Sequence, residues 1–303
     1  MIARVVGTVI ERGVAAFQFA AAGQETLDYI SSGQAMQNKL IEVSECGHVN
    51  LLVVVNRSDK FVFFMDGDIL AGARQNRVLN TSILLAPGTE TKVPVSCVER
   101  GRWHRTGSSF RPVDYVAPSK LRREKARAVT FSLGDGAGFE GNQEEVWSSV
   151  DEFHARSGVK SPTMNLSDIY DQKHAEFDDF LKRFQSDPDA NGVVFFVGNH
   201  VLGVDVFNRR DVFQEYFPKL LRSVALEAFY MQWPESPLTE TEGRFKALEF
   251  LDAIEYVESE EYPGVGAGRE RRFSSPTVSG FKLMYENHLV HLTALKTGSD
   301  VVV

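Results

Sequence analysis

Hydrophobic and polar positions alternate in short runs through the first part of the chain. Between residues 50 and 98 this pattern predicts four strands, at residues 51–55, 61–65, 78–85 and 91–98. Polar or turn-forming segments separate them, as at residues 57–60 and 86–90. Four strands at this spacing indicate consecutive antiparallel hairpins, so we expect an immunoglobulin-like sandwich in preference to a closed barrel.

The pattern takes a helical period after residue 117. Helices are predicted at residues 118–129, 143–157, 167–185, 211–231 and 241–254, and a compact hairpin at residues 193–207. Three further strand segments follow at residues 256–260, 269–273 and 279–295, and the last of these can itself form a hairpin. Helices and hairpins are segregated along the chain, and single strands do not alternate with single helices. This order disfavours a parallel nucleotide-binding sheet.

The fold class predicted from these elements is α+β. We expect an N-terminal antiparallel β-sandwich-like domain at residues 1–130, followed by a mixed α+β domain at residues 131–303. The glycine-rich segment 134–138 lies just beyond the predicted boundary and interrupts the helical pattern.

Composition excludes two broad classes of protein. With 43% hydrophobic residues and 11% aromatic residues the chain can build a core, so extensive disorder is excluded. No apolar run approaches the roughly 20 residues of a membrane-spanning helix, so we expect no membrane insertion. Two cysteines, Cys46 and Cys97, are too few for a disulfide scaffold or a cysteine-based zinc site, and they favour a reducing cytoplasm.

Charge is distributed unevenly between the two halves. Residues 1–130 hold 17 basic and 12 acidic residues, whereas residues 131–303 hold 16 basic and 29 acidic residues, for a net charge of −8 overall. Ten basic residues fall between Lys92 and Arg127, against three acidic ones. Such a stretch indicates an anionic partner, although neutralisation by the second half or a solvated basic face would explain it equally well.

Several familiar site chemistries are disfavoured. The segments 134–138 and 264–268 lack the full dinucleotide-binding spacing. His288 and His291 are three apart on a predicted strand, which sends their rings to opposite faces and argues against a joint metal site. Asp66 and Asp68 flank Gly67, where turn chemistry is a better explanation than metal binding. We therefore predict no metal site and no cofactor.

The strongest polar constellation comes from pairing the strands at 78–85 and 91–98 as a hairpin. In that register Arg77 faces Glu99 and Leu79 faces Cys97, to within one or two residues. The open end of the hairpin then gathers ten polar or aromatic residues: Arg74, Gln75, Asn76, Arg77, Glu99, Arg100, Arg102, Trp103, His104 and Arg105.

This cluster suggests a site for a phosphorylated or nucleotide-like small molecule. Guanidinium groups bind phosphate or carboxylate through paired N–H donors, and the Trp103 indole can stack on a base or sugar. The ligand-binding candidates are Arg74, Gln75, Asn76, Arg77, Arg100, Arg102 and Trp103. The alternative is structural: Arg77 pairs with Glu99 while the other arginines cap the end of the sandwich or pack against the second domain.

Three functional hypotheses follow. The first is a ligand-binding or regulatory module. The second is a hydrolase of phosphorylated substrates, with Glu99 or His104 as general base. The third is an interaction scaffold with a protein partner or a second copy of the chain. Nucleic acid binding is disfavoured, because the chain is acidic and few aromatic residues interleave with the basic stretch.

The same residues carry a resemblance to a known family. The sequences DGDILAGARQNRVLNTSILL at residues 66–85 and VPVSCVERGRW at residues 93–103 resemble the signature of the ARG and rhodanese-phosphatase-superfamily-associated protein domain, where ARG denotes ADP-ribosylglycohydrolase. The resemblance covers most of this chain. It implies an ADP-ribose-related or other phosphorylated ligand and extends the hydrolase hypothesis to ADP-ribosyl substrates, and it carries no catalytic residue over to this sequence.

Overall fold

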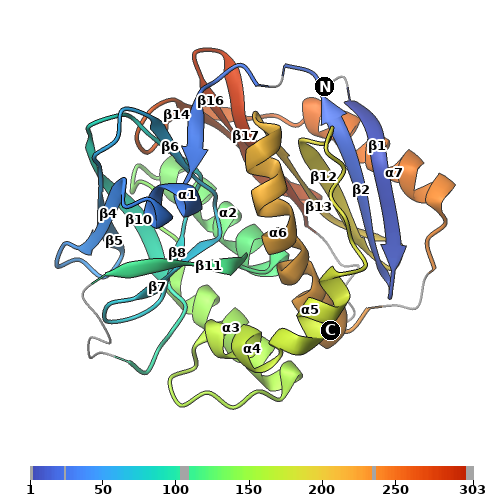
Figure 1. The fold of residues 1–303 in the computed structure, drawn as a ribbon, viewed down its shortest axis with the longest axis horizontal. Helices are drawn as coiled ribbons and strands as arrows, with labels where there is room; N and C mark the ends of the chain where they lie inside the picture. Colours follow the sequence, from blue (N-terminus) through green and yellow to red (C-terminus); the bar gives the residue numbers. More distant parts are fainter. Residues whose placement is uncertain (1–2, 24, 103–108, 234–236, 298–303) are drawn as a thin grey trace.

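The largest sheet combines strands from both ends of the chain. The computed structural model describes residues 3–23, 25–102, 109–233 and 237–297. Its eight-stranded sheet is antiparallel throughout (Figure 1). In spatial order the strands are β1 (Ala3–Glu11), β2 (Val14–Ala21), β12 (Gly192–Val197), β13 (His200–Phe207), β17 (His288–Lys296), β16 (Val278–Tyr285), β15 (Arg269–Ser274) and β14 (Glu260–Pro263).

The first half of the chain forms two smaller sheets around a separate apolar core. The six-stranded sheet has the order β11 (Phe110–Val116), β7 (Asp68–Gly72), β8 (Arg77–Leu79), β10 (Glu90–Cys97), β5 (Leu51–Asn56) and β4 (Ile41–Glu45). The three-stranded sheet has the order β3 (Tyr29–Ser31), β6 (Phe61–Phe64) and β9 (Ile83–Leu85). Side chains from both sheets share one buried cluster, which includes Val54, Phe64 and Leu79.

The α+β class is confirmed, but an immunoglobulin-like sandwich is not. β3 and β6 run parallel to each other. The strand predicted at residues 78–85 is in fact two strands in different sheets, since β8 pairs with β10 whereas β9 pairs with β6. The break falls at two buried polar residues whose partners lie outside the ladder: the Asn80 amide donates to the carbonyl of Phe139, and the Ser82 hydroxyl bonds to His291. The β8–β10 register places Arg77 opposite Cys97, two residues from the predicted pairing and within its stated range.

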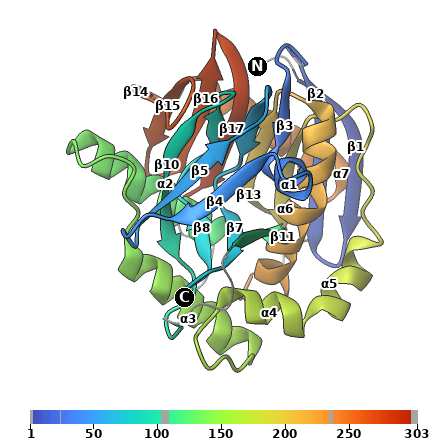
Figure 2. The same ribbon diagram turned by 60° about the vertical axis from the view of Figure 1, so that its left-hand side comes forward.

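Helices α2 (Ser119–Gly134) and α6 (Arg210–Tyr230) both pack against the large sheet. α2 packs on β15, β16 and β17, and α6 packs between β11 and the strands β12 and β13 of the large sheet (Figures 1 and 2). α7 (Glu240–Glu255) covers the opposite face of that sheet, where its buried residues Ala247, Leu251 and Ile254 join a second core. The large sheet is therefore covered on both faces.

The remaining helices connect these layers. α3 (Gln143–Ser157) has the predicted bounds, because the Asn142 side chain accepts from the backbone N–H groups of Glu144 and Glu145 and Gly158 ends the helix with φ 66°. The helix predicted at residues 167–185 is two shorter ones, α4 (Leu166–Gln172) and α5 (His174–Leu181). α1 (Ser32–Gln37) follows β3.

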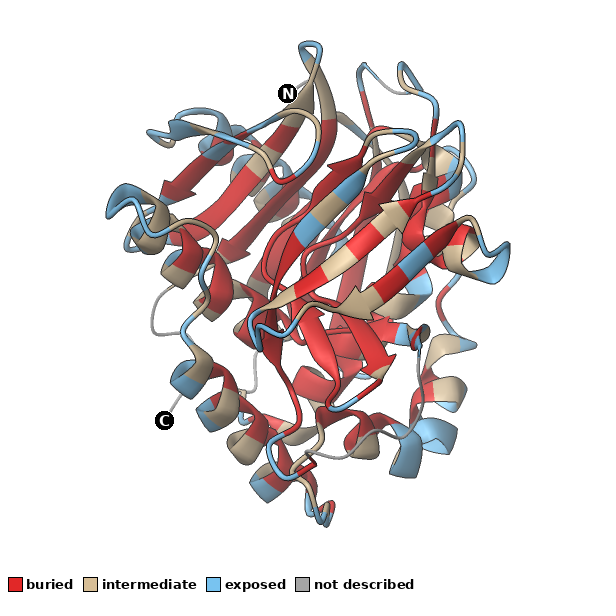
Figure 3. Ribbon diagram, turned by 90° about the vertical axis from the view of Figure 1, so that its left-hand side faces the viewer, coloured by how far each residue is buried: buried red, intermediate tan, exposed pale blue. Residues whose placement is uncertain are grey.

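Strand pairing crosses residue 130, where the sequence placed a domain boundary. β1 and β2 pair with the strands of the second half, and the largest apolar cluster draws on both halves. The central strands are buried almost throughout (Figure 3). The division into residues 1–130 and 131–303 stays a prediction. None of the helices in the described ranges combines the length and apolar character needed to span a bilayer.

Candidate functional site

The polar cluster predicted at the hairpin end is largely buried and bonded within itself. The Arg102 guanidinium meets the Glu99 carboxylate twice, with Nε 2.8 Å from Oε1 and Nη2 2.6 Å from Oε2. Glu99 also accepts from the Thr163 hydroxyl and from the backbone N–H of Asn76. Glu99 is therefore paired with Arg102, and not with Arg77 as the structural alternative had it.

Asn76 connects this cluster to the neighbouring helix. The Asn76 amide donates to Asn165 Oδ1 at 3.1 Å and to Ser167 Oγ at 3.0 Å, which ties the cluster to the start of α4. Arg77 Nη1 donates to Gln75 Oε1, whereas its Nε is buried and has no hydrogen-bond partner among the described residues. Burial lowers the pKa of Arg77.

Two of the predicted arginines face solvent instead. Arg74 lies 3.6 Å from Glu45, and its side chain is 59% exposed. Arg100 Nη2 lies 2.7 Å from Asp151 Oδ2, and the guanidinium packs over the Trp147 ring. Trp103 and His104 lie outside the described residues. Ligand binding at the hairpin end stays a prediction, and the cations seen there already have internal partners.

A second polar cluster, which the sequence did not reveal, lies between the two halves of the molecule. We call it the central cluster; its members are Asp66, Ser82, Arg122, Asp205, His291 and Thr293, all less than 5% exposed. Arg122 from α2 donates to Asp66 at 3.0 Å through both Nε and Nη2, and to Asp205 at 3.0 Å and 2.6 Å. Its Nη2 also donates to the Thr293 hydroxyl. One guanidinium thereby joins β13, β17 and the turn before β7.

His291 extends the central cluster toward Ser82. Its Nδ1 lies 3.0 Å from Ser82 Oγ, and its Nε2 lies 3.4 Å from Asp205 Oδ1. This is the order of a nucleophile, a base and a carboxylate, but both Ser82 and His291 are 0% exposed, so no substrate reaches them in this conformation. The central cluster is organised for cohesion between the halves.

The ligand atoms of Asp66, Asp205 and His291 lie within 4.8 Å of one another, close enough for a metal ion. Arg122 already places one positive charge on both carboxylates, and a divalent cation beside it would be repelled. The predicted turn chemistry holds for Asp68, whose side chain accepts from the backbone N–H of Met65. Asp66 bonds to Arg122 instead.

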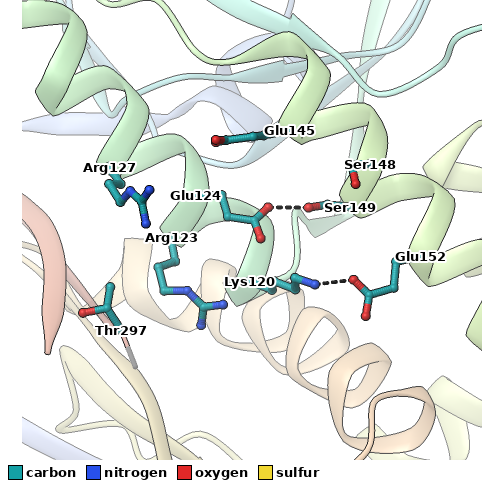
Figure 4. A pocket seen from close by; sticks show the side chains of 9 residues that line it. All are labelled: Lys120, Arg123, Glu124, Arg127, Glu145, Ser148, Ser149, Glu152 and Thr297. Carbon is teal, nitrogen blue, oxygen red and sulfur yellow. Dashed lines mark hydrogen bonds and ion pairs between the residues drawn. The ribbon is translucent and has the colours of Figure 1, made fainter. Parts of the chain in front are cut away.

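Helix α2 is basic on two faces, and its outer face lines a hollow on the surface. Arg122 and Lys125 point inward, where Lys125 donates to the carbonyl of Leu79. The hollow lies between α2 and α3 and has a volume of about 400 Å³ (Figure 4). Its lining is polar and charged: Lys120, Arg123, Glu124, Arg127, Glu145, Ser148, Ser149, Glu152 and Thr297.

In this hollow Lys120 and Glu124 have side-chain partners, whereas the two arginines do not bond to carboxylates in the described residues. Lys120 bonds to Glu152, and Glu124 accepts from the Ser149 hydroxyl (Figure 4). Burial raises the pKa of Glu124. Arg123 donates only to the backbone carbonyl of Lys296, and within the described ranges neither Arg123 nor Arg127 forms an ion pair with a carboxylate. The two guanidinium groups are thus available to an anion that enters the hollow.

Comparison with known proteins identifies one family. The sequence profile of the ARG and Rhodanese-Phosphatase-superfamily-associated Protein domain matches residues 5–295. No curated protein and no solved structure matches the chain. The match spans the large sheet, the two smaller sheets and the central cluster, and it confirms the resemblance carried by residues 66–85 and 93–103. The chain belongs to the ARG and rhodanese-phosphatase-superfamily-associated protein domain family.

Proposed function

We propose that this protein is a binding module for a small phosphorylated molecule, whose phosphate lies in the hollow between α2 and α3. The observation that carries the proposal is the pair of guanidinium groups of Arg123 and Arg127, which line the hollow without carboxylate partners in the described structure. Planar guanidinium forks bind phosphate oxygens through two parallel N–H donors. The Ser148 hydroxyl adds a neutral donor to the same hollow.

Size and family association are consistent with this proposal. A volume of about 400 Å³ falls at the lower end of the range that small-molecule sites occupy, which suits a phosphate group with a short substituent. The family name associates this domain with ARG and with the rhodanese-phosphatase superfamily. Phosphatases act on phosphorylated substrates, so the association is consistent with a phosphorylated ligand. The sequence prediction of an anionic partner for the basic stretch ending at Arg127 is retained, with the site moved to the outer face of α2.

The hydrolase hypothesis has weaker support. Glu99, one candidate base, accepts hydrogen bonds from Arg102, from Thr163 and from the backbone of Asn76, so its oxygens are engaged. A general base needs a free lone pair directed at the substrate. His104, the other candidate, lies outside the described residues. We therefore place binding before catalysis.

The proposal is tested by a thermal-shift titration with inorganic pyrophosphate, ADP, ADP-ribose and sugar phosphates. A ligand at 100 times its Kd stabilises the folded state by about 2.7 kcal/mol, which is readily measured. We expect this stabilisation in the wild type and its loss in Arg123→Gln/Arg127→Gln. The matched control is Arg74→Gln/Arg100→Gln, which removes two exposed cations from the hairpin end.

Two outcomes would contradict the proposal. If no phosphorylated compound stabilises the wild type, the binding function is wrong, and a protein partner or a second copy becomes the better hypothesis. If the control variant loses the response and the α2 variant keeps it, the ligand binds at the hairpin end, as the sequence first suggested.

A further inference from the structure

A larger hollow adjoins the one between α2 and α3. It has a volume of about 1070 Å³ and shares the lining residues Arg127 and Glu145 with the smaller hollow, so the two adjoin at these side chains. It extends along α2 past Phe131 to the glycine-rich segment 134–141 and is closed on the other side by residues around β14 and β15. A ligand whose phosphate lies at Arg127 therefore has room to extend in one direction.

The chemistry changes along the outer face of α2 from one hollow to the next. Arg123, Arg127 and Phe131 follow one another at intervals of four residues, so they lie on one side of α2, and Asp135 comes directly after the end of the helix. At a rise of 1.5 Å per residue, Phe131 lies about 12 Å along the axis from Arg123 and about 6 Å from Arg127. The order along the cleft is cationic, then aromatic, then acidic.

Phe131 is the unusual residue of this stripe. Its side chain is 73% exposed, although most phenylalanines of this chain are buried. An exposed ring that lines a hollow offers a flat apolar face, and any of the nucleobases can stack on it. Tyr262, which also lines the larger hollow, provides a second ring there.

The carboxylates of the larger hollow determine which end of a ligand enters it. Glu140, Glu258 and Glu260 line it together with Asp135. With Glu145 the larger hollow has five carboxylates against two guanidinium groups, whereas the smaller hollow has three carboxylates against three cations. The larger hollow therefore repels a second phosphate more strongly, and its carboxylates accept hydrogen bonds from sugar hydroxyls or exocyclic amines. A ligand with phosphate at both ends is therefore disfavoured, and one with a phosphate end and a neutral, hydrogen-bond-donating end fits both hollows.

We propose that the ligand is a nucleoside diphosphate or a derivative of one, with its phosphates at Arg123 and Arg127 and its base on Phe131. This inference rests on the proposed function and adds the class of ligand and the position of the base. The ribose hydroxyls lie toward the carboxylates of the larger hollow.

The test is calorimetric titration of the full chain with two probes, inorganic pyrophosphate and ADP. We expect wild type to bind ADP at least about tenfold more tightly than pyrophosphate, since loss of one stacking contact corresponds to a change of about 5- to 150-fold in Kd. Phe131→Ala is expected to weaken ADP binding by that factor and to leave pyrophosphate binding unchanged. Arg127→Gln is expected to weaken both.

A matched control is Phe245→Ala, which removes a phenylalanine of similar exposure, 69%, on α7. It should change neither Kd. Equal affinity for ADP and pyrophosphate, or full ADP affinity in Phe131→Ala, would overturn the position of the base while leaving the phosphate site in place. Absence of binding by both probes would overturn the proposed function together with this inference.

Discussion

Replacing Arg122 by Met leaves two buried carboxylates without their cation. The substitution removes five hydrogen bonds, two to Asp66, two to Asp205 and one to Thr293. Methionine retains much of the apolar stem, so the loss is mainly electrostatic. Removing one partner of a buried ion pair costs about 3–5 kcal/mol, and we expect the free energy of unfolding at pH 7 to fall by that amount.

The pH dependence of this loss follows from the pKa of Asp205. Burial alone would raise the pKa of Asp205, but the Arg122 guanidinium outweighs it and holds that pKa well below its ordinary value. A carboxyl group whose pKa is lowered by folding stabilises the folded state above its unfolded pKa, near 3.9, and this contribution is lost as the pH falls through the folded pKa. In Arg122→Met the carboxyl groups keep their burial without their cation, so their pKa lies above its ordinary value in the folded variant. The difference between wild type and Arg122→Met should therefore be largest at pH 7 and shrink as the pH falls toward 3.

Urea unfolding of the wild type and of Arg122→Met between pH 3 and pH 7 measures this difference. The variant Asp66→Asn/Arg122→Met/Asp205→Asn should recover part of the loss, because it removes the uncompensated charges. Arg127→Met, an exposed arginine of the same helix, should stay within about 0.5 kcal/mol of wild type. The reasoning is refuted if Arg122→Met loses less than about 1 kcal/mol, or if its loss is the same at every pH.

Three further outcomes are expected. Burial lowers the pKa of Lys125 to about 7, whereas an unfolded lysine stays protonated to about pH 10. The free energy of unfolding of the wild type, relative to that of Lys125→Met, should therefore rise between pH 7 and 9 by up to about 1.4 kcal/mol per pH unit. Urea unfolding measures both proteins, and a difference that does not change with pH would count against the prediction. Gly67→Ala places a Cβ 2.9 Å from Arg122 Cδ at φ 82°, so the Tm should fall, and an unchanged Tm would show that the turn relaxes. Cys97 is buried and its pKa is raised by burial, so its thiol should react with an aromatic disulfide reagent only in urea; rapid labelling in native buffer would contradict that burial.

The sequence predicted correctly those elements whose ends are determined by residues close to them in the chain. α3 was predicted with its observed bounds because its cap, its acidic first turn and its terminal glycine are all encoded within a few residues. The hairpin of β12 and β13 was predicted because two apolar runs flank a compact turn at Gly198. The strand at residues 78–85 was predicted as continuous because local pattern does not reveal that Asn80 and Ser82 have distant partners.

The central cluster could not be assembled from the sequence. Ser82 and His291 are 209 residues apart, and Arg122 and Thr293 are 171 apart, so no local spacing relates them. One signal was present: Asp205 and His291 interrupt the apolar strands β13 and β17, and a charged residue inside a buried strand needs a partner. The opposite faces predicted for His288 and His291 excluded a pair of histidines but did not indicate the carboxylates that His291 approaches.

Because β2, near one edge of the large sheet, pairs with β12, the first hairpin must wait during synthesis for a strand that is made much later. Ala21 in β2 bonds to Asn191, just before β12, and 170 residues separate the two. At about 5–20 residues per second, the ribosome needs roughly 10–30 s to supply that strand after the first hairpin has emerged. During this interval Phe17 and Phe19 have no β12 to pack against. The nascent hairpin is therefore the segment most exposed to aggregation and the one for which we expect chaperone protection to matter most.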